Sequence, residues 1–186
     1  MKVEPTDLPG VLVIEPQVFP DARGLVFESY RAERYAQAGI APSFVQDTHT
    51  RSGPRTLRGL HYQLTRPQAK LVRALRGTVW DVAADIRRGS PTFGRWTAIE
   101  LSAENRRQMY IPAGFAHGFC VLVGEAEVEY KCSDYYVPSD QHGVAWNDPT
   151  LAIAWPVREP LLSAQDRMLP PLLAARDLPS YDGSGA

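Results

Sequence analysis

The sequence predicts an all-β protein built as a sandwich, a jelly roll or a barrel, with a few short helices at its periphery. Three observations support this prediction. Short runs rich in Val, Tyr, Phe, Trp and Thr alternate in polarity, Gly and Pro residues separate them, and helical periodicity is scarce. The clearest strand-like runs are Val11–Ile14, Leu71–Leu75, Thr78–Ile86, Trp96–Leu101, Ala116–Val123 and Ala126–Lys131.

Turn-forming and helix-forming segments complete the order of elements. Arg76-Gly77 is a turn signal between two of the strand-like runs. Two segments favour a helix, Arg31–Ala38 and Leu169–Ala175, and Ser163 is placed to cap a turn ahead of the second. The length of 186 residues suits one domain spanning residues 1–186, with a loose tail from Tyr181 to Ala186.

The composition limits the classes of function. Apolar residues make up 44% of the chain and charged residues 22%, with a net charge of −1, so the strongly basic footprint of a nucleic-acid-binding protein is absent. Residues Met1–Gly10 lack the apolar run of a signal peptide, and no stretch approaches the ~20 apolar residues of a membrane helix. Cys120 and Cys132 are expected as free buried thiols. We therefore expect a cytoplasmic protein that binds neither nucleic acid nor a membrane.

Several polar residues occupy positions where a plain core would be apolar. The run from Glu125 to Lys131 alternates strictly, which places its charged residues on an outer face and Tyr130 on the inner face with Ala126 and Val128. His117, Lys70 and His61 also fall in strand-like runs. Each has an ordinary structural explanation: a core tyrosine, a satisfied core histidine, or a lysine that extends to solvent at a strand end. Four such residues on separate strands favour a polar pocket inside the barrel.

These residue types fit one chemistry. Removal of a proton from a carbon next to a ketone requires a base, an electrophile for the enolate oxygen and an acid on the opposite face. A histidine supplies a base near neutral pH, a lysine supplies positive charge, and a tyrosine hydroxyl supplies a proton. His61, Lys70 and Tyr130 are therefore candidates for the inversion of a carbon centre.

A longer set of motifs resembles the dTDP-4-dehydrorhamnose 3,5-epimerase family. The matching segments occur in the expected order along nearly the whole chain, and a set of this length is specific although each piece alone is short. They are Phe19-Pro20-Asp21-Ala22-Arg23-Gly24, Phe44-Val45-Gln46-Asp47, Leu57-Arg58-Gly59-Leu60-His61-Tyr62-Gln63, Gln68-Ala69-Lys70-Leu71-Val72-Arg73, Asp81–Arg87, Ser90-Pro91-Thr92-Phe93-Gly94, Ile111-Pro112-Ala113-Gly114-Phe115-Ala116-His117-Gly118-Phe119, Tyr130-Lys131, Asp134-Tyr135-Tyr136, Trp146-Asn147-Asp148-Pro149 and Ser163-Ala164-Gln165-Asp166.

The resemblance implies a cupin-type jelly-roll barrel, a homodimer, and a reaction without a metal or other cofactor. The implied substrate is a dTDP-4-keto-6-deoxyhexose that is epimerised at C3 and C5. His61 is implied as the base, Asp166 as the carboxylate that orients it, Lys70 as the enolate stabiliser and Tyr130 as the proton donor. The implied substrate-binding residues are Arg23, Glu28, Gln46, Asp47, Thr48, Arg58, His117, Tyr136, Gln141 and Gln165. Among them, guanidinium groups suit a diphosphate because each binds two oxygens at once.

The chain departs from the family pattern at three of these positions. Thr48 replaces the usual Asn, Gln141 often corresponds to Glu, and Gln165 often corresponds to Lys. Strict alternation also places Arg58 and His61 on opposite faces of one strand. Both can face a single pocket only if the strand contains a bulge, for which Gly59 is the natural position.

Three alternative functions remain open from the sequence. Pro112-Ala113-Gly114-Phe115-Ala116-His117 fits half of a metal-binding cupin pattern, although His61-Tyr62-Gln63 lacks the second histidine of the other half. A relative that inverts only C3 or only C5 would have the same fold and site. A sugar-binding protein without catalysis would require the pocket but not a base and an acid together.

Overall fold

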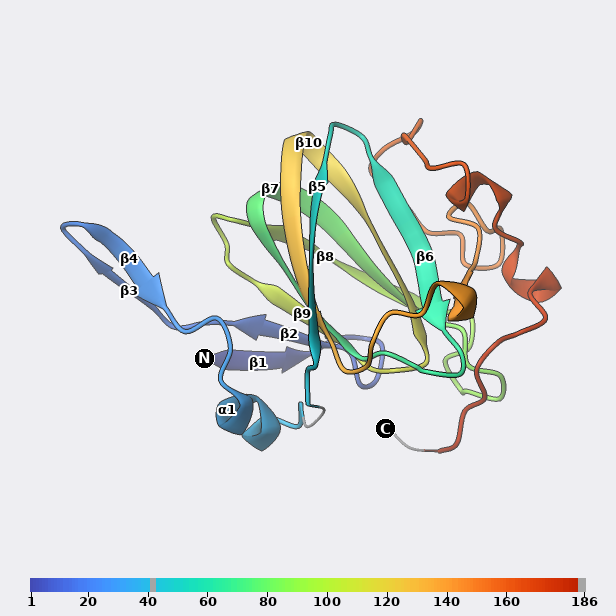
Figure 1. The fold of residues 1–186 in the computed structure, drawn as a ribbon, viewed down its shortest axis with the longest axis horizontal. Coiled ribbons are helices and arrows are strands. Elements are labelled where there is room, and N and C mark those ends of the chain that lie inside the picture. Colours follow the sequence, from blue (N-terminus) through green and yellow to red (C-terminus); the bar gives the residue numbers. More distant parts are fainter. Residues whose placement is uncertain (41–42, 184–186) are drawn as a thin grey trace.

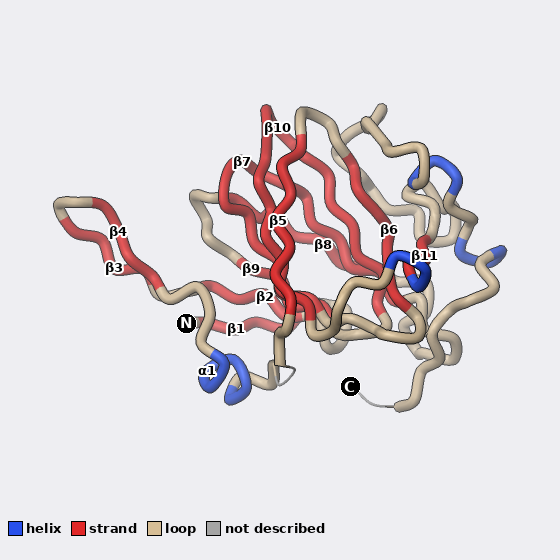
Figure 2. The backbone as a smooth tube through the Cα atoms, in the orientation of Figure 1, coloured by secondary structure: helices blue, strands red, loops and turns tan. Residues whose placement is uncertain are grey.

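A computed structural model describes residues 1–40 and 43–183 and confirms the all-β prediction (Figures 1 and 2). Within these residues nine strands form one antiparallel sheet that curls into a jelly-roll barrel, and two more form a separate hairpin. The strands are β1 Lys2–Pro5, β2 Leu12–Glu15, β3 Val18–Asp21, β4 Gly24–Phe27, β5 Gln46–Ser52, β6 Leu57–Gln63, β7 Lys70–Asp85, β8 Trp96–Ser102, β9 Gln108–Ile111, β10 Phe115–Cys132 and β11 Gln141–Gly143.

Two long strands, β7 and β10, pair with each other and join the two walls of the barrel. Each changes its second neighbour along its length. The first part of β7 pairs with β9 and the second part with β8, while the first part of β10 pairs with β6 and the second part with β5. The sheet therefore folds over on itself and encloses a space between its halves.

The continuity of these strands differs from the prediction of separate runs with a turn at Arg76-Gly77. Gly77 lies inside β7 at a φ of 70°, and a Cβ there would lie 2.2 Å from the carbonyl oxygen of Glu125. The glycine thus permits a sharp bend against β10, where the register also shifts, without ending the strand. Ala116–Val123 and Ala126–Lys131 are likewise one strand, β10.

The inner face of the barrel follows the predicted alternation. Ala126 and Val128 are fully buried in the main hydrophobic cluster, and Tyr130 packs against it, while Glu125 is exposed at the surface. Cys120 and Cys132 are both buried free thiols, as expected. The inner face of the strands therefore has two parts. Some of its side chains pack in the hydrophobic core, and others line the cavity.

The helical predictions are confirmed only in part. α1 spans Ala32–Gln37 inside the predicted Arg31–Ala38. The predicted helix Leu169–Ala175 is wrong, because only a 3-10 turn, η3 Leu172–Ala174, forms there. Pro170 and Pro171 lack backbone N–H groups and disfavour the helical conformation of the residue before them. Two further 3-10 turns are η1 Pro138–Asp140 and η2 Asp166–Met168.

The end of the chain is partly anchored. The backbone N–H of Tyr181, assigned above to the loose tail, donates to the carbonyl of Arg88 at 2.9 Å, and the Arg87 guanidinium lies 4.9 Å from its ring centre. Residues 184–186 of the predicted tail lie outside the described residues. In the described part of the chain, none of the helices has the length and apolar character needed to cross a membrane.

The hairpin β3–β4 projects away from the barrel (Figure 1). Its strands pair only with each other in the described sheet topology. Phe19, Leu25 and Val26 on this hairpin are 53%, 45% and 67% exposed. The hairpin therefore carries apolar surface that the rest of this chain leaves uncovered.

Candidate active site

A cavity of about 490 Å³ lies inside the barrel, lined from β5, β6, β7 and β10 and from the segments that follow β10. It brings together all four predicted catalytic residues: His61, Lys70, Tyr130 and Asp166. It also contains seven of the predicted binding residues: Gln46, Thr48, Arg58, His117, Tyr136, Gln141 and Gln165. An imidazole, an amine and a phenol hydroxyl thus line one cavity.

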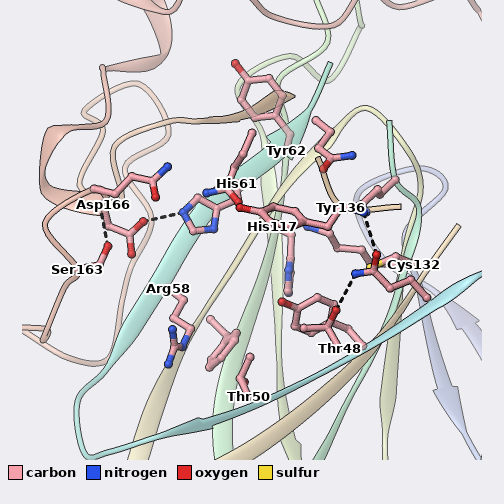
Figure 3. A pocket seen from close by; sticks show the side chains of 18 residues that line it. Thr48, Thr50, Arg58, His61, Tyr62, His117, Cys132, Tyr136, Ser163 and Asp166 are labelled. Carbon is pink, nitrogen blue, oxygen red and sulfur yellow. Dashed lines mark hydrogen bonds and ion pairs between the residues drawn. The ribbon is translucent and has the colours of Figure 1, made fainter. Parts of the chain in front are cut away.

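His61 and Asp166 form a dyad at one side of the cavity (Figure 3). The His61 Nε2 lies 2.6 Å from Asp166 Oδ1. Asp166 is held in turn by its own backbone N–H, which donates to Ser163 Oγ at 3.0 Å, so Ser163 caps this turn as predicted. Burial raises the pKa of Asp166, but the interaction with His61 and the hydrogen bonds with Ser163 and the Gly59 backbone together bring the pKa below its usual range. The ionised carboxylate can only accept, so the proton on His61 lies at Nε2 and Nδ1 is the basic nitrogen.

Arg58 and His61 share the cavity because β6 contains the irregularity that the sequence requires. His117 on β10 pairs with His61 on β6, and Phe119 pairs with Arg58. Between these two pairs β6 therefore has one more residue than β10, which is a bulge. Gly59 lies between them at a φ of 119°, and a Cβ there would lie 2.6 Å from Gly118 Cα. The glycine therefore allows the extra residue and the close approach of the two strands.

His117 and Lys70 also line the cavity. His117 Nε2 lies 2.8 Å from Asp81 Oδ1, and both side chains are buried. Burial lowers the pKa of His117, and Asp81 acts in the opposite direction. Burial also lowers the pKa of Lys70, against the opposing effects of Cys132 and Asp81. A buried amine beside a polar cavity is well suited to stabilise a developing negative charge on a ligand.

Tyr130, on β10, also lines the cavity. Its ring centre is 6.2 Å from that of His117, and the Lys70 Nζ lies 6.0 Å from its ring centre. Burial is the main reason that the pKa of Tyr130 is raised above its ordinary value. The hydroxyl therefore keeps its proton at neutral pH and can act as an acid.

The far end of the cavity carries neutral polar groups. The Gln46 Nε2 donates to Thr48 Oγ1 at 3.1 Å, and its Oε1 accepts from the backbone N–H of Tyr136 at 2.9 Å (Figure 3). The Tyr136 side chain is 49% exposed at the cavity rim, where an aromatic base can stack on it. In another part of the cavity wall, the charged Arg58 side chain donates from Nε to the Ser52 hydroxyl at 3.0 Å.

Three predicted binding residues lie outside this cavity. Arg23 is at the turn of the β3–β4 hairpin, 90% exposed, and pairs with Asp21 at 2.6 Å. Glu28 follows β4 and pairs with Arg34 at 2.9 Å. Asp47 points to the outer face of β5, because side chains alternate along a strand, and pairs with Lys131 at 3.0 Å.

Sequence reasoning missed other members of the site. Thr50 and Cys132 line the cavity, and Asp81 holds His117 from behind. The alternation of β5 could have revealed Thr50, two residues from Thr48. Asp81 had a stronger signal, since a carboxylate inside the apolar run Thr78–Ile86 is rarely buried without a partner. Within residues 1–40 and 43–183, no three or more His, Cys, Asp or Glu side chains gather as a metal site would require.

Comparisons with known proteins agree with the fold and identify the family. The family model described as dTDP-4-dehydrorhamnose 3,5-epimerase matches residues 5–174. A dTDP-4-dehydrorhamnose 3,5-epimerase from Pseudomonas aeruginosa is 54% identical over 169 residues, covering 90% of this chain and 93% of that protein.

Two solved structures have the same architecture. A dTDP-6-deoxy-D-glucose-3,5-epimerase from Legionella pneumophila, in complex with dTDP-4-keto-L-rhamnose, superposes with a TM-score of 0.95 at 46% identity, covering 97% of this chain and 98% of that one. A 3′-monoepimerase from Streptomyces bikiniensis, in complex with dTDP-quinovose, has a TM-score of 0.89 at 38% identity, with 95% and 92% covered. The fold is therefore the cupin-type jelly roll, and the chain belongs to the dTDP-4-dehydrorhamnose 3,5-epimerase family.

Proposed function

We propose that this protein converts dTDP-4-keto-6-deoxy-D-glucose to dTDP-4-keto-L-rhamnose by inverting C3 and C5. The observation that supports this most directly is the single cavity that holds the His61–Asp166 dyad, Lys70 and Tyr130. The related Legionella structure holds the proposed product in a barrel of the same shape.

The reaction proceeds through an enolate at each carbon. The Nδ1 of His61 removes the proton next to the C4 ketone, and Asp166 stabilises the imidazolium that forms. Lys70 stabilises the negative charge on the C4 oxygen. Tyr130 then donates a proton to the opposite face of the same carbon, which inverts it. The pair acts first on one carbon and then on the other.

The proposal is tested by incubating the protein with dTDP-4-keto-6-deoxy-D-glucose in heavy water and following the sugar by NMR. We expect solvent deuterium at both C3 and C5, together with the L-rhamno configuration. Deuterium and inversion at one centre alone would instead identify a single-centre epimerase, the activity named for the Streptomyces relative. Stoichiometric iron or zinc in the purified active protein, lost together with turnover on chelation, would favour a metal-dependent reaction.

We also propose that the protein is a homodimer in which the β3–β4 hairpin of each subunit packs on the other. The hairpin projects from its own barrel with Phe19 and Val26 exposed, and such apolar surface favours a partner. It also carries Arg23, a predicted diphosphate ligand that lies outside the cavity of its own chain. A second copy related by a two-fold axis would supply this guanidinium group to the neighbouring cavity.

The two free buried thiols support a reducing compartment such as the cytoplasm.

A further inference from the structure

Gln63 occupies the position at which the metal-binding cupin pattern would carry its second histidine, two residues after His61. It is the last residue of β6, lines the cavity and is only 4% exposed. Its Nε2 donates to the carbonyl oxygens of Arg66 at 2.8 Å and Tyr135 at 3.1 Å, and its Oε1 accepts from the backbone N–H of Val137 at 2.7 Å. Backbone carbonyls thus engage both N–H groups of the amide, which leaves the side chain no donor for a ligand.

The segment held by this amide, residues 134–137, follows β10 and carries Tyr136 at the cavity rim (Figure 3). In the described sheet topology it belongs to no strand, so side chains take the place of a neighbouring strand as hydrogen-bond partners. Gln46 on β5 accepts from the backbone N–H of Tyr136 at 2.9 Å, and Gln68 donates to the carbonyl of Asp134 at 2.7 Å. Glutamine side chains from different parts of the barrel therefore hold this segment by its backbone.

The Tyr136 side chain is 49% exposed, so the backbone beneath it has a large share in fixing the direction of its ring. We propose that Gln63 is a positioning residue that holds this backbone so that the Tyr136 ring is already in place for a nucleobase. The inference rests on the proposed function, in which the substrate carries dTDP and Tyr136 stacks on its thymine. β6 then serves both ends of the substrate, because it carries His61 at the sugar and Gln63 behind the nucleobase site.

Removal of the Gln63 amide leaves the segment free to adopt other conformations. The Tyr135 carbonyl and the Val137 N–H lose the partner that joins them to β6. Binding of a nucleotide must then order the segment as well. Fixing the backbone of one residue is equivalent to a factor of about 10 in affinity, which sets the size of the expected effect.

The test compares two substitutions of the same kind. Gln63→Met keeps the length of the side chain and removes its amide, and Gln37→Met on the exposed surface of α1 is the matched control. We expect Gln63→Met to raise the Kd of dTDP, measured by calorimetry, about 10-fold and to raise KM for the keto sugar nucleotide by a similar factor. The control should change neither value.

The division of the effect between KM and kcat separates a positioning role from a general structural one. In Gln63→Met we expect kcat to stay within about twofold, because a change that weakens binding of substrate and transition state equally leaves kcat unaltered. A fall in kcat without a rise in KM would show that Gln63 supports β6 and His61 only, and would overturn the inference.

A double-mutant cycle shows whether Gln63 acts through the Tyr136 ring. In a Tyr136→Ala background the ring is absent, so we expect the further change Gln63→Met to leave the Kd of dTDP unaltered. An equal weakening of dTDP binding in both backgrounds would contradict the inference, because the effect of Gln63 would then be independent of the ring.

Hydrogen exchange provides a measurement that needs no variant. The N–H groups of Tyr136 and Val137 are bonded to the amide oxygens of Gln46 and Gln63. We expect their amide protons, followed by NMR, to exchange at least about 10-fold more slowly than in an unstructured peptide. Exchange of the Val137 proton at the unstructured rate would show that Gln63 does not hold the segment.

The two proposals fail in different ways. If the unchanged protein does not bind dTDP, the proposed substrate is wrong, and the role of Gln63 falls with it. If the unchanged protein binds dTDP and inverts the sugar, while folded Gln63→Met binds dTDP equally well, only the role of Gln63 is wrong.

Discussion

His61 is the residue on which the proposed chemistry depends most. We expect His61→Asn to lower kcat by roughly 10²- to 10⁴-fold, the usual contribution of a general base, while binding of the nucleotide sugar survives. Steady-state turnover and calorimetric titration with dTDP measure the two effects. His49→Asn is the matched control, because His49 lies on the outer face of β5, 3.2 Å from Glu127. Turnover retained by His61→Asn would remove this residue from the mechanism.

Asp166 predicts a pH dependence of stability. Its pKa is lower in the folded protein than the ordinary value of about 3.9, so ionisation stabilises the fold above that value. The stabilisation is complete at neutral pH and is lost as the pH falls through the folded-state pKa. We expect the free energy of unfolding of Asp166→Asn to lie below that of the unchanged protein at pH 7, with the gap closing below about pH 4. Urea unfolding across this range measures the gap, and a gap of constant size would contradict the prediction.

The sequence alone was informative about which residues gather in the cavity and less so about which residues support them. Tyr130 was placed on the inner face by strict alternation in a seven-residue run, because a period of two leaves little ambiguity. Asp81 was missed: its position in an apolar run indicates only that it needs a buried partner, and its pairing with His117 depends on the pairing of β7 with β10, which no local pattern encodes. Arg23 was selected by its motif, yet its location depends on how a hairpin sits relative to a barrel.

The bulge in β6 lets the side chains of His61 and Arg58 face the same cavity. We expect Gly59→Ala to destabilise the protein by about 3 kcal/mol, from a left-handed backbone conformation together with a clash against backbone atoms of β10. The relevant contacts are 2.6 Å to Gly118 Cα and 2.7 Å to the His117 carbonyl oxygen. Thermal and urea unfolding provide the measurement.

Gly53→Ala serves as the control for this substitution. A Cβ at Gly53 meets no atom within 4 Å, so we expect a change of within about 0.5 kcal/mol. Equal stability of the two variants would show that the close approach at Gly59 is not required.

The helices and strands could be predicted where local sequence signals determine them. The points at which they end could not be predicted where contacts with distant parts of the chain determine them. α1 was found from its sequence pattern, within one residue at each end. The bend at Gly77 was interpreted as a turn, because a glycine that ends a strand and one that bends it look alike in sequence. Pro170 and Pro171 were underweighted as helix breakers, which led to the wrong helix at Leu169–Ala175.

At the scale of the whole molecule, the proposed dimer predicts recovery of activity on mixing two defective subunits. His61→Asn removes the base of its own cavity, and Arg23→Ala removes the guanidinium group that the hairpin supplies to the other cavity. A mixed dimer then contains one cavity with neither change. We expect random mixing to restore about a quarter of wild-type activity, since half the dimers are mixed and each has one intact site.

The mixture is formed by unfolding and refolding the two variants together, and sedimentation measures the state of association. Activity equal to the mean of the separate variants would show that each hairpin serves only its own chain.

The uninterrupted course of β7 and β10 has a consequence for the rigidity of the site. Lys70 begins one of these strands and Tyr130 lies near the end of the other, and the same strands run through the hydrophobic core. The backbone that carries Lys70 and Tyr130 is continuous with strand segments in the hydrophobic core, which open last. Amide protons in the parts of β7 and β10 that run through the core should therefore exchange as slowly as those of the deepest core, and the spacing of Lys70 and Tyr130 persists while these two strands stay paired.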